Sequence, residues 1–237
     1  MSGHSHWAGI KHRKGINDAK RARVFTKLAK PIVIAARSDG GNPDTNFKLR
    51  LAIDKAREFN MPKENIDRAV KRGAGGLKGA QMEEIVYEAM GPGGIMMLIK
   101  TTTDNKNRTL GEIKTILTKT GGKFGEAGSA MWNFEPAGSI IVDAEGKDAE
   151  ELELMAIDSG AKDIQSEEGV MKIFTDPSNL QKVQENLEKN GFKILEAELA
   201  YLPKNTAKID EKNRATYEKL LEALDEQEDV DEIFDNL

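Results

Sequence analysis

The basic side chains near the start of the chain have the clearest chemical potential. Between Gly3 and Lys30 the sequence holds eight Lys or Arg residues and a single acidic residue, Asp18. Lysine and arginine side chains displace condensed counterions from phosphates, so such a segment favours contact with a nucleic acid. These contacts position a backbone but do not read a base sequence. The chemistry indicated here is therefore electrostatic binding without a reaction.

Charge is divided unevenly along the chain. The 237 residues have a formal net charge of −5. Residues 1–78 hold 18 basic and 7 acidic side chains, whereas residues 79–237 hold 17 basic and 33 acidic ones. This split indicates that the first third of the chain approaches an anionic partner. The alternative is a solvated helical surface that is basic by chance.

Residues 1–15 are expected to form an extended basic arm ahead of the first helix, and Trp7 is the aromatic residue of this arm. Its ring would either stack on an unpaired base or anchor the arm to the following helices by its apolar surface. The other candidates are basic residues and one histidine, in the arm and on those helices. The candidate nucleic-acid-binding residues are Trp7, Lys11, His12, Arg13, Lys14, Lys20, Arg21, Arg23, Lys27, Arg50, Arg57, Arg68, Lys71 and Arg72.

Catalytic and metal-binding patterns are weak in this sequence. All three histidines precede residue 13, so the rest of the chain has no imidazole for acid–base chemistry near neutral pH. The absence of cysteine removes thiolate nucleophiles and Cys-based zinc sites. If Met1 were removed, Ser2-Gly3-His4 could bind Cu(II), but this arrangement arises by chance. We therefore expect no catalytic residue, no metal site and no cofactor, and an enzyme acting on a phosphate ligand is the least favoured function.

Three short helices are expected to carry the basic residues that follow the arm. Val24, Leu28 and Ile32 recur every four residues, which predicts a helix starting near residue 17. Pro31 would either kink this helix or begin a second one. Apolar spacing predicts further helices over about 46–59 and from residue 62 to Gly73, because glycine is typical just beyond a helix end.

Strand and helix patterns alternate after a glycine-rich linker at residues 73–79. Two strands joined by a tight turn are followed by a helix whose N-cap is Asp104 or Asn105. From 139 to 202 the order is strand-helix-strand-strand-helix-strand, which is the ferredoxin-like order. The expected strands are 84–88, 95–103, 130–134, 139–142, 162–166, 170–175, 194–201 and 230–234, and the expected helices are 107–120, 149–158, 177–189 and 212–224.

These patterns predict an α+β fold. We expect an N-terminal three-helix domain followed by two α/β, ferredoxin-like domains, the middle one discontinuous. The expected domains are the basic arm and helices at 1–78, the discontinuous domain at 79–137 plus 205–237, and the inserted domain at 138–204. A functional surface formed by residues 105–108 beside the glycine-rich segment 120–130 is a weaker hypothesis.

Long motifs of this sequence resemble the YebC family. They include "GHSHWAGIKHRKG", "DAKRARVFTKL", "LRLAIDKAREFNMPKENIDRAVKRGAGG", "YEAMGPGG", "TDNKNRT" and "MWNFEPAG", and the resemblance covers the whole length. The family is described as probable transcriptional regulators and includes mitochondrial translational activators of cytochrome c oxidase. The sequence departs from the family pattern at His6, where a lysine is expected, at Pro31, and at Met90, which replaces an aromatic residue.

The resemblance implies a three-domain, non-enzymatic protein associated with nucleic acid. Two functions stay open: a DNA-binding transcriptional regulator, or a ribosome-associated translation factor that binds rRNA or tRNA. The acidic α/β domains would act as a spacer or contact other proteins. We expect a cytoplasmic protein, because no secretory signal is recognisable and the longest apolar runs are too short to span a membrane.

Overall fold

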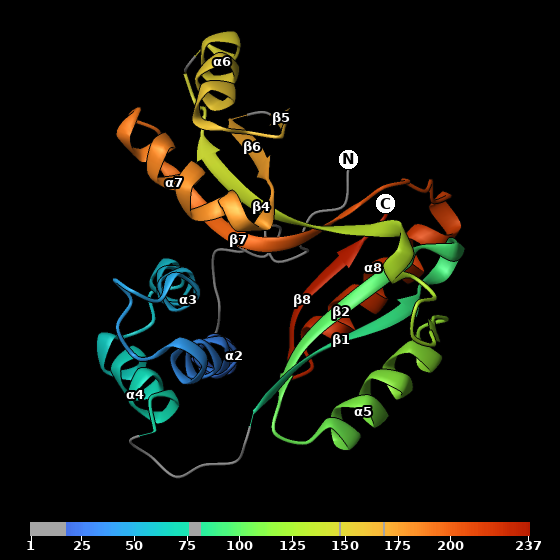
Figure 1. Ribbon diagram of the computed structural model, residues 1–237. Helices are drawn as coiled ribbons and strands as arrows, with labels where there is room; N and C mark the ends of the chain where they lie inside the picture. Colours follow the sequence, from blue (N-terminus) through green and yellow to red (C-terminus); the bar gives the residue numbers. More distant parts are fainter. Residues whose placement is uncertain (1–17, 76–81, 147, 168) are drawn as a thin grey trace. The chain divides into compact units, whose positions relative to one another are not determined.

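The chain folds as two compact units. The computed structural model describes residues 18–75, 82–146, 148–167 and 169–237. One unit comprises the described residues up to Glu135 together with Leu202–Leu237, and the other is Pro136–Tyr201. The expected fold class is confirmed, because a three-helix region precedes mixed α/β structure with two antiparallel sheets (Figure 1). The three domain ranges stay a prediction.

A three-helix region opens the first unit. Its helices pack through apolar faces whose residues recur every three or four positions, including the fully buried Ile32 and Leu49. Helix α2 continues through Pro31, so the proline neither ends the helix nor begins another. Asn46 caps α3, because its Oδ1 accepts a hydrogen bond from the backbone N–H of Leu49 at 3.0 Å. The helices are α2 (Asp18–Asp39), α3 (Phe47–Glu58) and α4 (Lys63–Gly73).

Gly73 is the last residue of α4, and its lack of a side chain lets α2 pack closely against it. A Cβ atom at this position would lie 2.3 Å from the carbonyl oxygen of Val33 and 2.7 Å from the Cβ of Ala36. Helices α2 and α4 therefore approach too closely for any side chain at Gly73. The expected helix boundary is correct, but the glycine serves the contact between two helices rather than a left-handed cap; Ala74 is the C-cap residue.

The first unit also contains an antiparallel sheet with the strand order β3-β1-β2-β8. Strands β1 and β2 form the expected hairpin, in which Glu83 pairs with Thr103 and Met90 pairs with Met96. Strand β8 comes from the C-terminal end of the chain and pairs with β2, so the sheet joins segments distant in sequence (Figure 1). The strands are β1 (Glu83–Met90), β2 (Met96–Thr103), β3 (Lys123–Phe124) and β8 (Val230–Asp235).

Two helices, α5 (Lys106–Lys119) and α8 (Glu211–Asp225), cover one face of this sheet. Met97, Ile99 and Ile233 of the sheet form one buried cluster with Leu117 of α5 and Leu220 of α8. Successive strand residues point to opposite faces, so the neighbours of Ile99 and Ile233 point away from this core. Helix α2 contacts β2 and β8, where these outward-pointing neighbours include charged side chains.

The expected strand over 130–134 is wrong in part. Residues Met131–Asn133 form a 3₁₀ turn, η2, and the strand begins only at Phe134. The backbone N–H groups of Ala130 and Met131 donate hydrogen bonds to the carboxylate of Glu88, at 2.6 and 2.8 Å. Because those groups bind a side chain, they are not available for a strand ladder.

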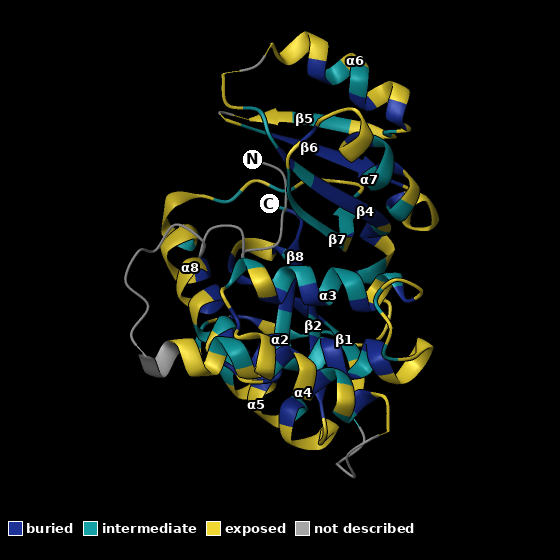
Figure 2. Ribbon diagram, turned by 90° about the vertical axis from the view of Figure 1, so that its left-hand side faces the viewer, coloured by how far each residue is buried: buried dark blue, intermediate teal, exposed yellow. Residues whose placement is uncertain are grey.

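The second unit has the strand order β5-β6-β4-β7 and two helices. The chain order of these elements gives the ferredoxin-like arrangement, with helices that follow the first and third strands (Figure 2). In the first sheet, by contrast, the consecutive strands β1 and β2 are the central pair. The elements are β4 (Phe134–Asp143), α6 (Ala149–Ser159), β5 (Asp163–Glu167), β6 (Val170–Thr175), η3 (Pro177–Asn179), α7 (Leu180–Lys189) and β7 (Ile194–Pro203).

Among the helices in the described part of the chain, none combines the length and the apolar character that crossing a membrane requires.

Candidate nucleic-acid interface

Helices α2 and α4 enclose a groove with a volume of about 390 Å³. Most of its apolar lining comes from Ala22, Phe25, Ala29 and Val33 of α2 and Ala69 of α4, and Met82, just before β1, also contributes. Phe25 is half-buried and packs against the core of the helical region. The groove therefore presents a fixed apolar floor, made by the same helical faces that build the core.

Arg68 and Arg72 line the α4 side of this groove, one helical turn apart. Within the described ranges, neither guanidinium forms a hydrogen bond or an ion pair. Arginine presents five N–H donors in a planar fork that matches phosphate geometry. Two arginines with free donors beside an apolar floor can bind a phosphate backbone and leave room for a sugar or a base.

Other candidate residues on these helices are also exposed. Arg21 and Arg23 lie exposed in the first turns of α2, and Lys71 is exposed next to Arg72 on α4. For Arg23 and Lys71, no hydrogen bond or ion pair is formed within the described part of the chain. The surface of α2 and α4 thus keeps several cations available for an external anion.

Lys27 has a different environment from its neighbours on α2. Its side chain is buried, and Nζ donates a hydrogen bond to the carbonyl oxygen of Asp225 and lies 3.9 Å from Oδ1 of that residue. Burial lowers the pKa of Lys27, although Asp225 and Asp231 favour its charged form. The structure therefore gives the Lys27 ammonium a partner inside the protein, away from any external phosphate.

The candidates on α3 are partly engaged. The guanidinium of Arg50 lies over the Phe47 ring, 5.5 Å from its centroid, which is a cation–π contact. Arg57 is exposed and forms an ion pair with Asp54 at 3.0 Å. Such exposed pairs are weak, so a phosphate could displace Asp54. The structure does not bring these two residues into the groove between α2 and α4.

The remaining candidates are five residues of the arm and Lys20. Trp7, Lys11, His12, Arg13 and Lys14 lie outside the described residues. Lys20 is part of α2. The proposed contacts of these residues stay predictions.

Three lysines of the helical region meet acids from the C-terminal segment. Lys30 forms an ion pair with Asp229 at 2.6 Å, and Lys55 forms one with Glu232, also at 2.6 Å. The third is Lys27 with Asp225, described above. Glu232 also pairs with Lys100 of β2 at 3.3 Å. Asp225, Asp229 and Glu232 therefore neutralise cations of the helices instead of facing an external polyanion.

Asp229 is the most connected of these acids. Its Oδ2 accepts hydrogen bonds from Arg108 Nη2 at 2.8 Å and from Thr109 Oγ1 at 2.6 Å. Burial would raise the pKa of Asp229, but hydrogen bonds from Arg108, Lys30 and Thr109 outweigh it and hold the pKa well below its ordinary value. The sequence carries no local signal for this cluster, because Lys30 and Asp229 lie at opposite ends of the chain.

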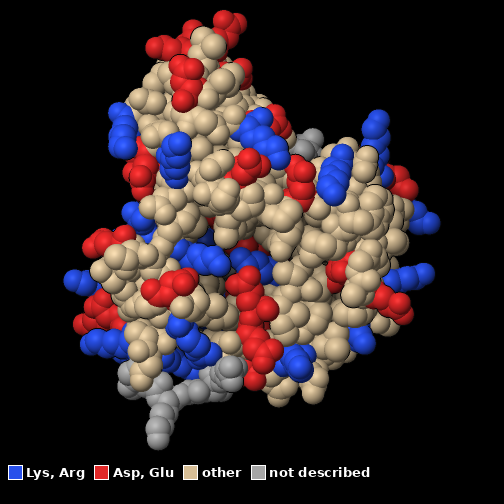
Figure 3. Space-filling view, viewed as in Figure 1, with Lys and Arg blue, Asp and Glu red and all other residues tan. Residues whose placement is uncertain are grey.

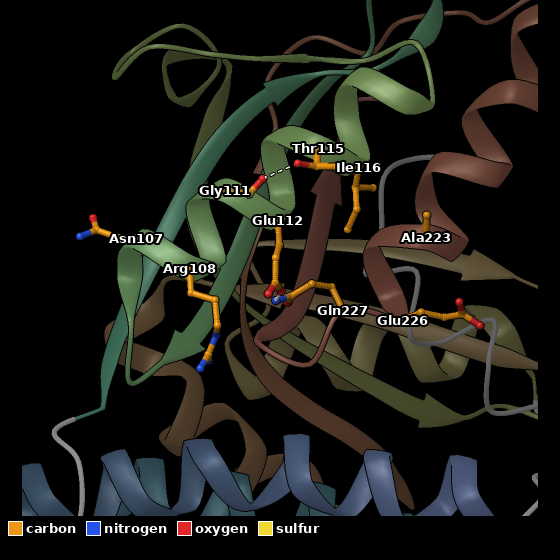
Figure 4. A pocket seen from close by; sticks show the side chains of 9 residues that line it. All are labelled: Asn107, Arg108, Gly111, Glu112, Thr115, Ile116, Ala223, Glu226 and Gln227. Carbon is orange, nitrogen blue, oxygen red and sulfur yellow. Dashed lines mark hydrogen bonds between the residues drawn. The ribbon is translucent and has the colours of Figure 1, made fainter.

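A second hollow, of about 520 Å³, lies between α5 and α8 (Figure 4). Glu112 accepts a hydrogen bond from Gln227 Nε2 at 2.9 Å across this hollow, and Glu226 adds a second carboxylate. Asn105 caps α5, and Arg108 pairs with Asp104 and Asp229. Residues 105–108 are thus largely engaged in holding α5, which makes this hollow the weaker candidate.

The two units differ in the charges at their surfaces. In Figure 3, acidic side chains gather over α6, whose first turn contains Glu150 and Glu151. Over the helical region, basic and acidic side chains alternate on the face shown. The second unit, residues 136–201, holds 6 basic and 15 acidic residues. It is therefore unsuited to contact phosphates over most of its surface.

Two models of known protein domains match the chain. The model of the TACO1/YebC protein N-terminal domain matches residues 5–76, and that of the TACO1/YebC second and third domain matches residues 82–237. The chain belongs to the TACO1/YebC family. The resemblance stated from the sequence motifs is thereby confirmed. The residues of α2 and α4 that line the groove lie in the part of the chain matched by the N-terminal domain model.

Relatives in the family match the chain over its full length. A probable transcriptional regulatory protein of Caldanaerobacter subterraneus is 49% identical over 238 residues, covering 100% of this chain and 98% of the relative. A second one, from Thermoanaerobacter pseudethanolicus, is also 49% identical and is covered to 97%. The crystal structure of a conserved hypothetical protein from Aquifex aeolicus is 45% identical, with a TM-score of 0.88, covering 98% of this chain and 96% of that one.

Proposed function

We propose that this TACO1/YebC-family protein is a non-enzymatic regulator that binds nucleic acid through the groove between α2 and α4 together with its basic arm. The observation that carries this proposal is the pair Arg68 and Arg72, whose guanidinium groups line the groove without an ion pair or hydrogen bond among the described residues. Arginines without internal partners at the rim of an apolar groove are suited to a phosphate backbone.

The internal ion pairs support the same proposal. Acids of the C-terminal segment would repel a polyanion if they were exposed near the basic helices. Instead Asp229 and Glu232 are buried and neutralised by Lys30 and Lys55. Among the described residues, Arg23 of α2 and Lys71, Arg68 and Arg72 of α4 stay without an internal hydrogen bond or ion pair. These cations favour the α2 and α4 side of the helical region as the one that meets the nucleic acid.

A non-enzymatic role fits the ionisable groups of the described region. The buried carboxylates of Glu88, Asp229 and Glu232 each accept hydrogen bonds from neighbouring groups of the protein. They hold loops and helices in place, and none of the three lines either of the two hollows described above. We propose the absence of catalysis on this basis.

Transcription is the process that we favour, because the relatives are named probable transcriptional regulatory proteins. We therefore propose a cytoplasmic, DNA-binding transcriptional regulator. Binding to rRNA or tRNA on the ribosome is the other possibility that the sequence leaves open. The acidic surface of the second unit, notably α6, is proposed to contact proteins.

The test is the salt dependence of binding to a duplex DNA oligonucleotide. Each lost phosphate contact reduces the slope of log K against log salt concentration by about 1. We expect the double variant Arg68→Gln/Arg72→Gln to bind more weakly, with a slope smaller by about 2 and an unchanged melting temperature. Lys63→Gln is the matched control, since Lys63 is exposed on the same helix but does not line the groove. An unchanged affinity and slope in the double variant would exclude the groove as the interface.

Sedimentation of cell extract, with and without RNase treatment, distinguishes DNA from the ribosome. A transcriptional regulator is expected to migrate apart from ribosomes under both conditions. Co-sedimentation with ribosomes that RNase treatment abolishes would contradict the DNA proposal and favour the ribosomal one.

A further inference from the structure

Trp132 exposes more of its side chain than a tryptophan in a folded protein normally does. It lies in the 3₁₀ turn η2 of the first unit and is 56% exposed. Tryptophan is highly buried on average, because its ring carries a large apolar surface. An exposed indole ring that is held in place is therefore a candidate binding surface.

Hydrogen bonds hold the backbone on the N-terminal side of this ring. The buried carboxylate of Glu88 accepts hydrogen bonds from the backbone N–H groups of Gly128, Ala130 and Met131, at 2.6, 2.6 and 2.8 Å. Burial would raise the pKa of Glu88, but these amides outweigh it and lower the pKa, so the carboxylate stays ionised near neutral pH. The indole Nε1 of Trp132 also donates to the carbonyl oxygen of Ser129 at 3.2 Å.

The C-terminal side is held by the segment at residues 204–205. Asn133 is buried, and its Nδ2 donates to the carbonyl oxygen of Asn205 at 2.9 Å while its Oδ1 accepts from the backbone N–H of Asn205 at 3.1 Å. Lys204 Nζ donates to the carbonyl oxygen of Trp132 at 3.1 Å. The backbone of Trp132 is thus fixed on both sides. A ligand that stacks on the ring therefore loses little binding free energy in ordering this side chain.

The surroundings of Trp132 decide which partner it fits. The groups that form hydrogen bonds with Trp132 are polar or cationic, namely the carbonyl of Ser129 and the ammonium of Lys204. Of its two neighbours in the chain, Asn133 is polar and Met131 is apolar. A protein–protein contact centred on an exposed tryptophan normally needs apolar neighbours that exclude water. A planar base needs only the face of the ring, and a nearby ammonium neutralises its phosphate. The flat ring and the adjacent Lys204 therefore favour a nucleotide.

We propose that Trp132 is a stacking platform for an unpaired base of a single-stranded nucleic acid, with Lys204 beside it contacting the phosphate. The inference rests on the proposed nucleic-acid-binding function and adds a second contact, separate from the groove between α2 and α4. The platform would contact a single-stranded segment of that nucleic acid, because the base faces inside a duplex are already stacked on each other and are not accessible.

Tryptophan fluorescence tests this directly. The chain has two tryptophans, Trp7 and Trp132, so the variant Trp7→Phe leaves Trp132 as the single indole emitter. Oligo(dT) and oligo(rU) of twelve nucleotides, labelled at one end, serve as probes, and binding is followed in parallel by the anisotropy of the label. We expect both signals to saturate together, with strong quenching of Trp132, and the two probes show whether the single strand is DNA or RNA.

Substitutions at the platform complete the test. We expect Trp132→Ala to weaken oligonucleotide binding about tenfold and Trp132→Phe to retain part of the affinity, since stacking contributes a substantial part of the binding free energy per base. Glu88→Gln is expected to loosen the turn, lowering both the affinity and the steady-state anisotropy of Trp132 emission. Leu154→Ala, at another exposed apolar residue, is the matched control and should change nothing.

Two results would overturn the proposal in distinguishable ways. Oligonucleotide binding by anisotropy without quenching of Trp132, or full affinity in Trp132→Ala, excludes the platform and leaves the nucleic-acid-binding function standing. Failure of the unsubstituted protein to bind any single-stranded or duplex probe at low salt excludes both.

Discussion

Lys30 and Asp229 form an ion pair with a distance of 2.6 Å between Nζ and Oδ1, although they lie 199 positions apart in the sequence. Asp229 also binds Arg108 and Thr109 of α5 through its other oxygen. One carboxylate thus ties the first helix of the helical region to α5 and to the turn before β8. The helical region is joined to the sheet by charges that the chain itself neutralises.

Asp229→Asn is expected to lower the free energy of unfolding by about 2–4 kcal/mol, because it leaves Lys30 and Arg108 without their shared counter-charge at a buried position. Chemical denaturation measures the change. Asp104→Asn is the control: Asp104 also pairs with Arg108 but is exposed, so its loss should change stability by no more than about 0.5 kcal/mol. Equal effects of the two substitutions would contradict a central role for Asp229.

Asp231 predicts a pH dependence of stability. Both of its carboxylate oxygens are buried, and neither has a hydrogen-bond partner in the described part of the chain. Burial raises the pKa of Asp231 to about 7, although the nearby Thr102 side chain and the charge of Lys100 favour the ionised form. Between its ordinary pKa and pH 7, Asp231 is therefore protonated in the folded protein but ionised in the unfolded chain. Its contribution to the free energy of unfolding is fully present below the ordinary pKa of aspartate and is lost as the pH rises through 7.

The substitution Asp231→Asn removes this titration. We expect the variant and the unsubstituted protein to have similar stability near pH 4, and the variant to be more stable by about 2 kcal/mol at pH 8. Thermal melting across this pH range measures the difference. Parallel stability curves for the two proteins from pH 4 to pH 8 would show that Asp231 does not hold a proton in the folded state.

Substitutions at Lys27 and Arg23 are expected to have opposite effects on the stability of the protein and on its affinity for nucleic acid. Lys27 is buried against Asp225, whereas Arg23 is exposed on the same helix. Lys27→Gln should lower the free energy of unfolding by about 1 kcal/mol and leave nucleic-acid affinity unchanged, because the lost interaction is internal. Arg23→Gln should do the opposite, reducing affinity severalfold with a stability change below about 0.5 kcal/mol. Denaturation and fluorescence-anisotropy titrations of both variants check this; a large loss of affinity in Lys27→Gln at unchanged stability would contradict the buried position.

Gly73→Ala is expected to destabilise the helical region by about 2–3 kcal/mol, because the added Cβ would overlap the carbonyl oxygen of Val33. Gly111→Ala is the matched control within a helix. A Cβ at Gly111 meets no atom within 4 Å, so alanine should stabilise α5 by about 0.5–1 kcal/mol. Thermal melting of the two variants should therefore shift in opposite directions, and a shift in the same direction would refute the packing role of Gly73.

Much of the secondary structure is predictable from the sequence because helical periodicity is a local property. The apolar spacing on α3 and the cap at Asn46 involve residues within two turns of each other. The same holds for the hairpin of β1 and β2, whose short turn contains Pro92 and Gly93. Each of these elements was expected at nearly the observed positions.

Where an element depends on a distant partner, local patterns were insufficient. The apolar run 130–134 has the composition of a strand, yet Glu88 from β1 captures the amides of Ala130 and Met131 and turns the backbone. Gly73 has the signature of a helix cap, but its small size is required by the approach of α2. In both cases a hydrogen bond or a close contact with a distant residue outweighs the weak conformational preference of the local sequence.

The candidate site likewise has features that the local sequence predicts and features that depend on distant residues. The sequence alone predicts the dense positive charge of the site, its helices, and the arginines at positions 68 and 72. Composition and spacing suffice for this because they are properties of a short segment. Which cations stay available was decided only by the tertiary structure. Lys27 and Arg23 are equally basic and lie one turn apart on α2, yet acids from the C-terminal end of the chain reach one and not the other. Long-range packing selects such pairs, and no local pattern encodes them.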